Sequence, residues 1–334
     1  MNRIDAGCPL CSSASGVVIS QKARDGSPLT TILCEGCGLA RVHPLPSAEE
    51  LASFYRDHYR LLYKATYQPK NYHVLRAARV ALERIRQLHG FLAAGLDLVD
   101  VGCGGGEFLY LLRAAGCHVA GIEANIGYGS YARDELGLDV RIGLIEDQQF
   151  PAGSVDGATL FHVLEHLPAP VEALSHVARW LRPDGFLAVE VPNFESTCEH
   201  PAHRFHRAHL FHFTPPTLTR CGELAGLTAV RSMTSRDGGN LFVVFEPDPD
   251  LAQRAPLPRG PIPGWFERQW RIEKSRAAWR YWASPATTER TLRRLRRMVW
   301  ERLAAKRYAS RRAILDAAAK SVPPLEDRPH PAVE

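Results

Sequence analysis

Short apolar runs and segments with a helical period alternate along the chain between residues 96 and 246. Short apolar runs predict strands, and apolar positions that recur at helical spacing predict helices. The predicted strands are 96–101, 118–122, 139–142, 155–161, 185–191, 228–233 and 240–246, and the predicted helices are 107–115, 127–136, 170–181 and 215–225. This alternation favours an α/β fold in which helices cover both faces of a seven-stranded, mostly parallel sheet.

The segments before and after this region have different patterns. Residues 1–46 carry paired cysteines, and 47–95 is predicted to be a helical connector with apolar residues at helical spacing: Val74, Ala78, Leu82, Ile85 and Leu88. Six prolines at 247–264 indicate an extended linker. Beyond it we expect a basic, Trp- and Arg-rich helical extension at 265–320 and a flexible tail at 321–334.

The composition is that of a globular protein. Of the 334 residues, 45% are hydrophobic and 23% are charged, which excludes a wholly disordered, collagen-like or membrane-embedded chain. A net charge of +5 is only mildly basic, so a nucleic-acid partner must be argued from where the charge lies. No apolar segment follows Met1, and no run reaches about 18 apolar residues, so we expect a cytoplasmic protein without a transmembrane segment.

Four of the eight cysteines form two CxxC pairs, Cys8 with Cys11 and Cys34 with Cys37. Two thiolates two residues apart bind one ion, and two such pairs complete a tetrahedral site with no open position. The pattern therefore predicts a structural zinc ion in a zinc ribbon at 1–46. A redox CxxC and an iron centre are the alternatives.

A glycine-rich segment follows the first predicted strand and reads Asp100-Val101-Gly102-Cys103-Gly104-Gly105-Gly106-Glu107. Glycines let the backbone turn tightly against a ligand, and free N–H groups at the helix start point into the cleft. Glu123 stands at the tip of the second strand, where a carboxylate can accept both ribose hydroxyls of an adenosine. A dinucleotide fingerprint needs a third glycine where this chain has Glu107, which disfavours a nicotinamide or flavin site. A purely structural turn is the other alternative.

The G-x-G-x-G run, with an acid before it in the strand, resembles the first motif of class I S-adenosylmethionine-dependent methyltransferases. The resemblance extends over residues 96–246 and implies a Rossmann-like catalytic domain with S-adenosylmethionine as cofactor. Many members have Asp at the position of Leu144, so here the Ile145 N–H or the acids Glu146 and Asp147 must contact adenine. The implied cofactor-binding residues are Asp100, Gly102, Cys103, Gly104, Gly106, Glu123, Ala124, Ile145, Glu146 and Phe161.

Residues 160–167, Leu-Phe-His-Val-Leu-Glu-His-Leu, resemble the subgroup that includes the ubiquinone-biosynthesis O-methyltransferases. The Asn/Asp-Pro-Pro-Tyr tetrapeptide of many amino-N methylases is absent, which favours a hydroxyl acceptor. A hydroxyl must lose its proton, and histidine is the usual agent near neutral pH, so His162 and His166 are candidate catalytic residues. In that subgroup a Glu/Glu/His set can hold a divalent ion here, but His162 takes the place of the first acid. A loop anchored by Glu165 and His166 without catalysis is the alternative.

Five histidines recur at every third position, at His200, His203, His206, His209 and His212. This period does not place them on one helical face. The segment follows the fifth strand, where the resembling enzymes place acceptor-binding loops, so we expect His209 or His212 to act as a base or to bind the acceptor. Loop packing and a second metal site are the alternatives.

The extension at 265–312 holds fifteen Lys and Arg residues against four Glu, with tryptophans between them. Its apolar helical stripe consists of Leu292, Leu295, Val299 and Leu303. One hypothesis is that this stripe packs on the catalytic domain or on a second subunit. The other is an electrostatic surface for RNA, anionic glycan or membrane phosphates.

The sequence thus predicts a methyltransferase that uses S-adenosylmethionine to methylate a hydroxyl of a small-molecule or glycan-type acceptor. RNA is a less favoured partner. The alternatives are a zinc-bearing RNA base methyltransferase, a C-methyltransferase acting on a nucleotide sugar, and a non-catalytic adaptor that binds the cofactor. The sequence does not indicate the oligomeric state.

Overall fold

Seven strands form one mixed sheet in the computed structural model, which describes residues 2–47, 50, 68–248 and 257–327. The strands are β5 (Asp97–Val101), β6 (His118–Glu123), β7 (Asp139–Ile142), β8 (Val155–Phe161), β9 (Leu181–Pro192), β11 (Leu227–Thr234) and β12 (Asn240–Pro247). Their order is β11-β12-β9-β8-β5-β6-β7. β5 pairs in parallel with β6 and β8, and β6 with β7, whereas β12 is antiparallel to both β9 and β11. The predicted α/β fold with a seven-stranded sheet is confirmed.

Most predicted boundaries lie within two residues of the observed ones, with one informative exception at β9. The helix expected at 170–181 ends earlier, as α6 (Pro170–Ala178), and the strand begins at Leu181 rather than at 185. Arg182 accounts for part of this extension, because its Nε lies 2.9 Å from Oδ1 of the buried Asp156. Residues 182–184, which the sequence pattern places in neither a helix nor a strand, therefore belong to β9.

The chain divides into two compact units. One comprises residues 1–50, 161–179 and 187–293, and the other 51–160, 180–186 and 294–334. The boundaries predicted from the sequence remain predictions.

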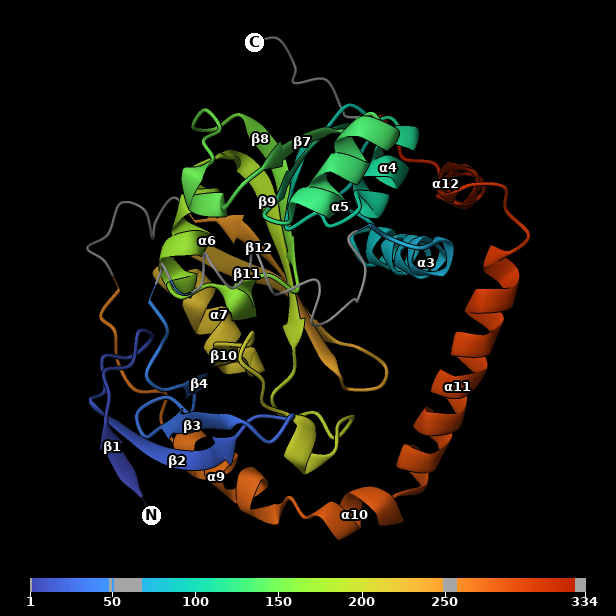
Figure 1. The fold of residues 1–334 in the computed structure, drawn as a ribbon. Helices are drawn as coiled ribbons and strands as arrows, with labels where there is room; N and C mark the ends of the chain where they lie inside the picture. Colours follow the sequence, from blue (N-terminus) through green and yellow to red (C-terminus); the bar gives the residue numbers. More distant parts are fainter. Residues whose placement is uncertain (1, 48–49, 51–67, 249–256, 328–334) are drawn as a thin grey trace. The chain divides into compact units, whose positions relative to one another are not determined.

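In the second of these units, three helices pack against one another: α3 (Asn71–Gln87), α4 (Glu107–Ala114) and α12 (Arg311–Ala319). Figure 1 shows them side by side. The Tyr110 hydroxyl of α4 donates to Asp316 Oδ1 of α12 at 2.5 Å, and Leu315 of α12 is fully buried. This unit also holds α5 (Ile126–Ser130), the π-helix η2 (Tyr131–Glu135) and the 3-10 helix η3 (Ile145–Asp147).

The first unit contains a second, smaller sheet. It is built from β1 (Arg3–Asp5), β2 (Ser15–Lys22), β3 (Pro28–Cys34), β4 (Ala40–Val42) and β10 (Phe211–His212), in that order. The first four strands come from the predicted zinc ribbon. The fifth comes from the histidine-rich segment and pairs antiparallel with β4, Phe211 opposite Arg41. The described residues of this unit also form η4 (Leu164–His166), α6, η5 (Pro201–His203) and α7 (Pro215–Leu224).

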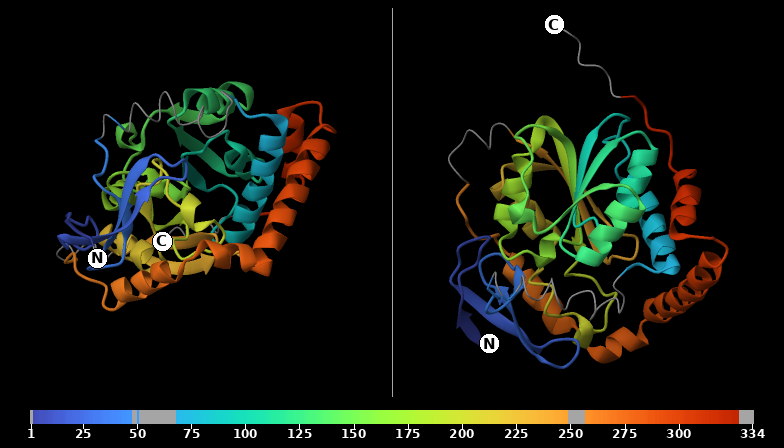
Figure 2. Two further views of the ribbon diagram at one scale, coloured as in Figure 1. Left: turned by 60° about the horizontal axis from the view of Figure 1, so that its bottom comes forward. Right: turned by 45° about the horizontal axis from the view of Figure 1, so that its top comes forward.

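The basic extension is helical, as expected. It forms α9 (Trp265–Ser275), α10 (Ala278–Ala283), α11 (Pro285–Ala305) and α12. α9 lies against β3, which can be followed in Figure 2 as the orange helix beside the blue strands. Phe266 and Trp270 of α9 pack on a cluster that includes Leu33, Val42 and Phe205. This part of the extension is therefore a component of the small sheet's core.

The apolar stripe on α11 is not buried. Leu292, Leu295, Val299 and Leu303 are 50%, 53%, 59% and 59% exposed. Packing of the stripe on a second subunit stays a prediction.

Parts of four predicted segments lie outside the described residues: residue 1 of the zinc ribbon, 48–49 and 51–67 of the connector, 249–256 of the linker and 328–334 of the tail. Among the residues that are described, none of the helices has the length and hydropathy needed to span a bilayer.

Candidate functional site

The glycine turn connects β5 to α4. Gly102, Gly104 and Gly106 have φ angles of 71°, 59° and 76°, a region that L side chains disfavour. A Cβ at Gly106 would lie 2.5 Å from Leu138 Cδ1 and 3.0 Å from Ala132 Cβ. Backbone geometry and close packing therefore both require glycine at the start of α4.

Glu123 at the end of β6 is fixed beside this turn. Its Oε2 accepts from Gly104 N and its Oε1 from Asn125 N, each at 2.8 Å. A carboxylate oxygen offers two lone pairs, so both oxygens retain capacity to accept the hydroxyls of a ribose. A pre-oriented carboxylate next to a left-handed glycine turn fits the adenosyl part of S-adenosylmethionine.

Asp100 and Cys103 are both buried beside the turn. Asp100 is 4% exposed, its Oδ1 accepts from Thr159 Oγ1 at 2.6 Å, and burial raises its pKa to about 7. Burial also raises the pKa of the Cys103 thiol well above its usual value. Asp100 thus joins β5 to β8 beneath the turn, and a cofactor role for either residue remains a prediction.

The remaining predicted cofactor residues lie at the ends of neighbouring strands. Ala124 follows Glu123 directly, Ile145 is the buried first residue of η3, and Glu146 after it is exposed. In the first unit the Phe161 ring stacks on Phe242, with centroids 6.0 Å apart. Their contacts with a cofactor stay predictions.

The four N-terminal cysteines form one buried cluster. The Sγ atoms of Cys8 and Cys37 are 3.7 Å apart, those of Cys11 and Cys34 are 3.4 Å apart, and all four lie within 4.8 Å of one another. Tetrahedral Zn–S bonds of about 2.3 Å place sulfurs about 3.8 Å apart, so these residues fit a closed zinc site.

The surroundings of the cluster suit a charged thiolate site. Arg41 is 3% exposed, and its Nη2 donates to the carbonyls of Ala6 and Gly7, at 3.0 and 2.7 Å. Burial lowers the pKa of Arg41, and the neighbouring cysteines oppose that shift. A buried guanidinium beside four sulfurs is stabilised when they carry negative charge, as zinc-bound thiolates do.

Glu165 of η4 is the centre of a second cluster, directly after β8. Its side chain is 1% exposed, and neither carboxylate oxygen has a hydrogen-bond partner among the described residues. Its Oε1 lies 3.4 Å from His162 Nδ1, 3.8 Å from His166 Nε2 and 3.9 Å from His209 Nε2. The structure thus brings three of the predicted catalytic histidines together around one carboxylate.

The protonation of these rings differs. His166 Nδ1 lies 2.6 Å from the Ala208 carbonyl, which can only accept, so this nitrogen carries the proton and Nε2 faces Glu165. Burial lowers the pKa of His209 well below its usual value, and it is neutral at pH 7. Burial also lowers the pKa of His162, but Glu165 and then Glu190 outweigh it and raise that pKa to about 9. One histidine is therefore cationic and another is an unprotonated acceptor.

His162 has two further features of a constrained site. Its φ is +58°, rare for a residue with a Cβ, and such strain is concentrated at functional sites. Its Nε2 lies 3.4 Å from Glu190 Oε1, which also accepts from Asn240 Nδ2 at 2.9 Å. The ligand atoms of Glu165, His166 and His209 lie within 4.8 Å of one another, a spacing that can also hold a divalent ion.

His212 has different neighbours. It lies in β10, with its ring centroid 6.1 Å from that of Phe194 and 5.1 Å from that of Phe205. Burial lowers its pKa to about 3, and its Nε2 has no hydrogen-bond partner among the described residues. His212 is not within ion-pair distance of Glu165 in the described part of the chain, although its ring centroid lies 6.2 Å from that of His209.

A cavity of about 370 Å³ borders this cluster, and we call it the histidine cavity. Its lining includes His162, His209 and His212, together with polar side chains such as Asn193, Arg204, Asp237 and Asn240. All of these residues belong to the first unit.

Sequence reasoning did not single out Glu190, Asn193, Arg204 or Asn240. Glu190 carried one usable signal, because it is an acid inside an otherwise apolar predicted strand. Asn193 follows β9, Arg204 lies in a loop and Asn240 begins β12, and only the tertiary structure brings them to the cavity.

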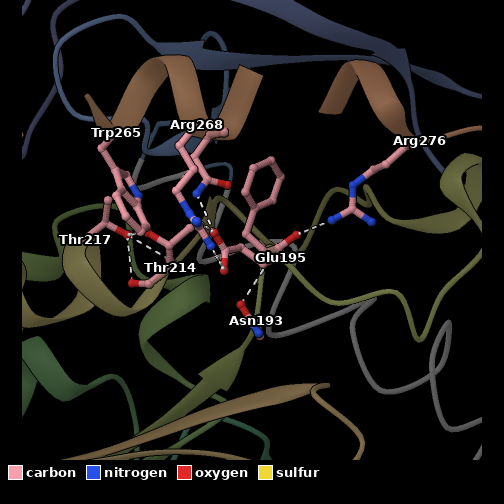
Figure 3. Close-up of polar contacts among 9 residues, drawn as sticks. Asn193, Glu195, Thr214, Thr217, Trp265, Arg268 and Arg276 are labelled. Carbon is pink, nitrogen blue, oxygen red and sulfur yellow. Dashed lines mark hydrogen bonds and ion pairs between the residues drawn. The ribbon is translucent and has the colours of Figure 1, made fainter. Parts of the chain in front are cut away.

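Helix α9 holds one wall of the histidine cavity in place (Figure 3). Glu195, next to the lining residue Phe194, accepts from Gln269 Nε2 at 2.7 Å and from Arg268 Nε at 3.1 Å. Arg276 donates to the carbonyls of Phe194 and Ser196, at 2.9 and 2.8 Å. The extension therefore anchors the segment that follows β9.

Comparison with known proteins agrees with this geometry. Residues 72–232 match a family described as a methyltransferase domain. The ubiquinone biosynthesis O-methyltransferase of Aromatoleum aromaticum is 34% identical over 98 residues, 28% of this chain and 42% of that protein. A probable S-adenosylmethionine-dependent methyltransferase of Mycolicibacterium smegmatis is 31% identical over 137 residues, 40% of this chain and 52% of that protein. The chain thus spans about half or less of the length of these curated relatives.

Among solved structures, the 1,6-didemethyltoxoflavin-N1-methyltransferase of Burkholderia thailandensis aligns at 19% identity, with a TM-score of 0.46, over 63% of this chain and 96% of that chain. With a score this low, the alignment adds nothing to the sequence matches. The matches with methyltransferases agree with the seven-stranded sheet and with the glycine turn beside Glu123, which are features expected of a domain that binds S-adenosylmethionine. The same chain contains a buried four-cysteine cluster.

Proposed function

We propose that this protein is a methyltransferase that transfers the methyl group of S-adenosylmethionine to a hydroxyl of a small polar or sugar-type acceptor. The observation that carries the proposal is the group of three histidines around Glu165, which borders a cavity lined by polar side chains. The ubiquinone biosynthesis relatives, which are named as O-methyltransferases, support a hydroxyl acceptor.

The histidine cavity supports a polar acceptor. At about 370 Å³ it is within the range of small-molecule sites, which begins at roughly 300 Å³. Its amide, carboxylate and guanidinium groups come from Asn193, Asp237, Asn240 and Arg204. A polyol offers a hydrogen-bonding group at nearly every carbon, and such a ligand leaves fewer of these lining groups unpaired than an apolar one.

His209 is the residue we propose as the general base. It lines the cavity, and its low pKa leaves the ring unprotonated and able to accept the hydroxyl proton. Glu165, 3.9 Å from His209 Nε2, would stabilise the imidazolium that forms. His162, with its raised pKa, would stay cationic and donate a hydrogen bond to the acceptor.

When bound, S-adenosylmethionine supplies an electrophilic methyl group with a good leaving group. The chain's own residues then have to align the acceptor oxygen and remove its proton as the C–O bond forms. We assign cofactor binding to the glycine turn and Glu123, and proton removal to His209.

The four cysteines are proposed to hold a structural zinc ion. Their burial and sulfur spacing support this assignment, and a closed set of four thiolates leaves no position for substrate. Zinc at this site would stabilise the small sheet, whose strands β3 and β4 flank the second cysteine pair.

The test is methyl transfer from labelled donor into metabolite, glycan and RNA fractions, with His209→Ala compared with His203→Ala. His203 belongs to the same histidine series but is exposed and does not line the cavity, so it is the matched control. Loss of a general base lowers the rate by about 10²–10⁴-fold, whereas the control should keep it. Transfer by His209→Ala within twofold of the unmodified protein would refute the assignment.

The same assay separates the alternative functions. Label found only in RNA, with activity that falls steeply with salt, would favour the RNA hypothesis. Donor binding without label in any fraction would favour the adaptor. Activity that is lost on chelation while the cysteine-bound zinc is retained, and that an added divalent ion restores, would mean that the Glu165 cluster holds a metal instead of serving as base and counter-ion.

A further inference from the structure

A second cavity, of about 270 Å³, lies between the C-terminal helices and the segment at 197–201. Three arginines line it, Arg276, Arg280 and Arg290, together with hydroxyl groups of Ser275, Ser284 and Thr287. We call it the arginine cavity. Glu199 is the one acidic residue among the described residues that line it.

Among the residues that the structure describes, carboxylates balance the positive charge around the arginine cavity only in part. Arg276 Nε lies 3.3 Å from Glu273 Oε2, but that same oxygen is 2.6 Å from Arg204 Nη1, so one carboxylate serves two guanidinium groups. Arg280 and Arg290 form no ion pair within the described ranges; Arg290 Nη2 donates to the Thr197 carbonyl and Arg280 Nη1 to that of Ser275. Carbonyl partners satisfy N–H groups, but they do not neutralise the charge.

The free-energy cost of burying a positive charge without a full counter-charge is greatest at Arg276. Its side chain is 8% exposed, and burial, followed by the nearby Arg204, lowers its pKa to about 10. A buried cation without a full counter-charge is unfavourable, and an anion in the cavity would remove that cost.

The donor set of the cavity indicates which anion it suits. A guanidinium group carries five N–H donors in a planar fork that matches phosphate oxygens, and the hydroxyl side chains add further donors. Arg280 donates to one carbonyl, that of Ser275 at 3.2 Å, and its other N–H donors have no hydrogen-bond partner in the described part of the chain.

From the cavity, its charge and these donors we propose that the arginine cavity binds a phosphate or diphosphate group of a small molecule. We further infer that this group belongs to the acceptor, and this second part rests on the proposed function. Glu199 lines both cavities, while Ser196 and Cys198 line the histidine cavity and Thr197 the arginine cavity. One ligand can therefore occupy both cavities across this short segment, with its hydroxyl part at the histidines.

A small molecule is favoured over a nucleic acid by the position of the aromatic side chains. Trp279 and Trp282 are 67% and 68% exposed, and neither is among the residues lining the cavity. Nucleic-acid channels place stacking rings along a groove that follows the backbone. Here the arginines and hydroxyls line a cavity, and the exposed rings are outside it.

The experiment is calorimetric titration of the full chain with inorganic pyrophosphate, using Arg280→Gln, Arg290→Gln and the control Arg271→Gln. Arg271 is an exposed arginine of α9 outside the cavity lining, so its variant removes the same charge. We expect saturable binding that weakens about tenfold or more in Arg280→Gln, as for a lost charge-assisted hydrogen bond, and changes less than twofold in the control. Absence of binding, or equal weakening in Arg280→Gln and Arg271→Gln, would overturn the proposal.

Arg280→Gln is the decisive variant. Arg290 also donates a hydrogen bond to the Thr197 carbonyl, so substitution of Arg290 can displace the segment at 197–201 for reasons unrelated to ligand binding. If a single-stranded oligonucleotide binds more tightly than pyrophosphate and loses affinity in Arg280→Gln, the ligand of the arginine cavity is a nucleic acid, and the small-molecule proposal is overturned.

The acceptor part of the inference is tested on the labelled reaction product. We expect it to be retained on an anion exchanger and to lose negative charge after phosphatase treatment. A product without phosphate, together with Arg280-dependent pyrophosphate binding, would overturn the assignment to the acceptor. Pyrophosphate binding without any methyl transfer would instead refute the proposed function, but it would still support the proposed phosphate site.

Discussion

Gly106 is the position where the glycine turn is most sensitive to a small change. It begins α4 with φ of +76°, and an added Cβ would lie 2.5 Å from Leu138 Cδ1 and 3.0 Å from Ala132 Cβ. Gly106→Ala therefore imposes two separate costs, backbone strain and overlap with buried side chains. Gly95 has nearly the same φ, +79°, with no atom within 4 Å of its Cβ position, so Gly95→Ala imposes the strain alone.

The expected magnitudes follow from these two costs. A non-glycine residue in the left-handed region costs about 1–2 kcal/mol. Overpacking a core position adds about 1–3 kcal/mol, because 2.5 Å is far below any real carbon contact. We expect Gly106→Ala to destabilise the protein by about 2–5 kcal/mol and Gly95→Ala by about 1–2 kcal/mol.

Urea unfolding of both variants measures the difference, with S-adenosylmethionine binding measured in parallel at low denaturant. Gly106→Ala should also weaken donor binding, because relieving the overlap moves the backbone at the start of α4. Gly95→Ala should bind the donor normally. Equal destabilisation of the two variants, or unchanged donor affinity in Gly106→Ala, would refute the argument that close packing fixes this glycine.

Three further predictions concern charge and metal. Cys34→Ser should abolish stoichiometric zinc, measured by elemental analysis of the purified protein, and should make unfolding insensitive to chelators; a variant that keeps zinc at full stoichiometry contradicts the four-cysteine site. The folded pKa of Asp100, about 7, exceeds the ordinary 3.8, so the folded state holds an extra proton between these values and loses stability as pH rises through them. Asp100→Asn removes this loss, so its stability relative to the unmodified protein should rise from pH 5 to pH 8, and a pH-independent difference would contradict the burial argument. For His162 the folded pKa is raised to about 9 from 6.5, so its contribution to stability is complete below pH 6.5 and is lost as pH rises through about 9. His162→Gln should therefore flatten the decline in melting temperature between pH 7 and 9.5, and an unchanged decline would show that Glu165 and Glu190 do not hold the charged ring.

The central sheet was predictable because its strands carry strong local signals. All seven residues of β8 are buried, and the sequence there is a continuous run without charge except for Asp156. Gly102, Gly104 and Gly106 mark the end of β5 because the backbone there needs left-handed conformations. Signals of this kind depend on neighbouring residues, and sequence analysis detects them directly.

The second sheet was only partly predictable. Strand β10 has two residues, and it forms because the edge of β4 is available to pair with Phe211 and His212. Nothing in the histidine-rich segment itself indicates a strand. Similarly, the packing of Phe266 and Trp270 on the core of the small sheet depends on contacts with residues more than 200 positions earlier in the sequence, such as Leu33 and Val42.

The candidate site was also predictable only in part from the sequence. His162 and His166 follow β8 in sequence, so their proximity to Glu165 follows from chain connectivity. His209 joins them only because its segment returns to η4, where Leu210 N donates to the Glu165 carbonyl at 2.8 Å. The partners that complete the cluster, Glu190 and Asn240, come from different strands of the sheet.

The most direct test of the account is calorimetric titration of the purified, zinc-loaded chain with S-adenosylmethionine and with S-adenosylhomocysteine, for the unmodified protein and for Glu123→Gln. The account predicts one saturable site for both ligands, with affinity at least about tenfold weaker in Glu123→Gln, because the amide cannot accept both ribose hydroxyls while Gly104 N and Asn125 N keep their partner. Heat signals that show no binding of either ligand to the unmodified protein would contradict it.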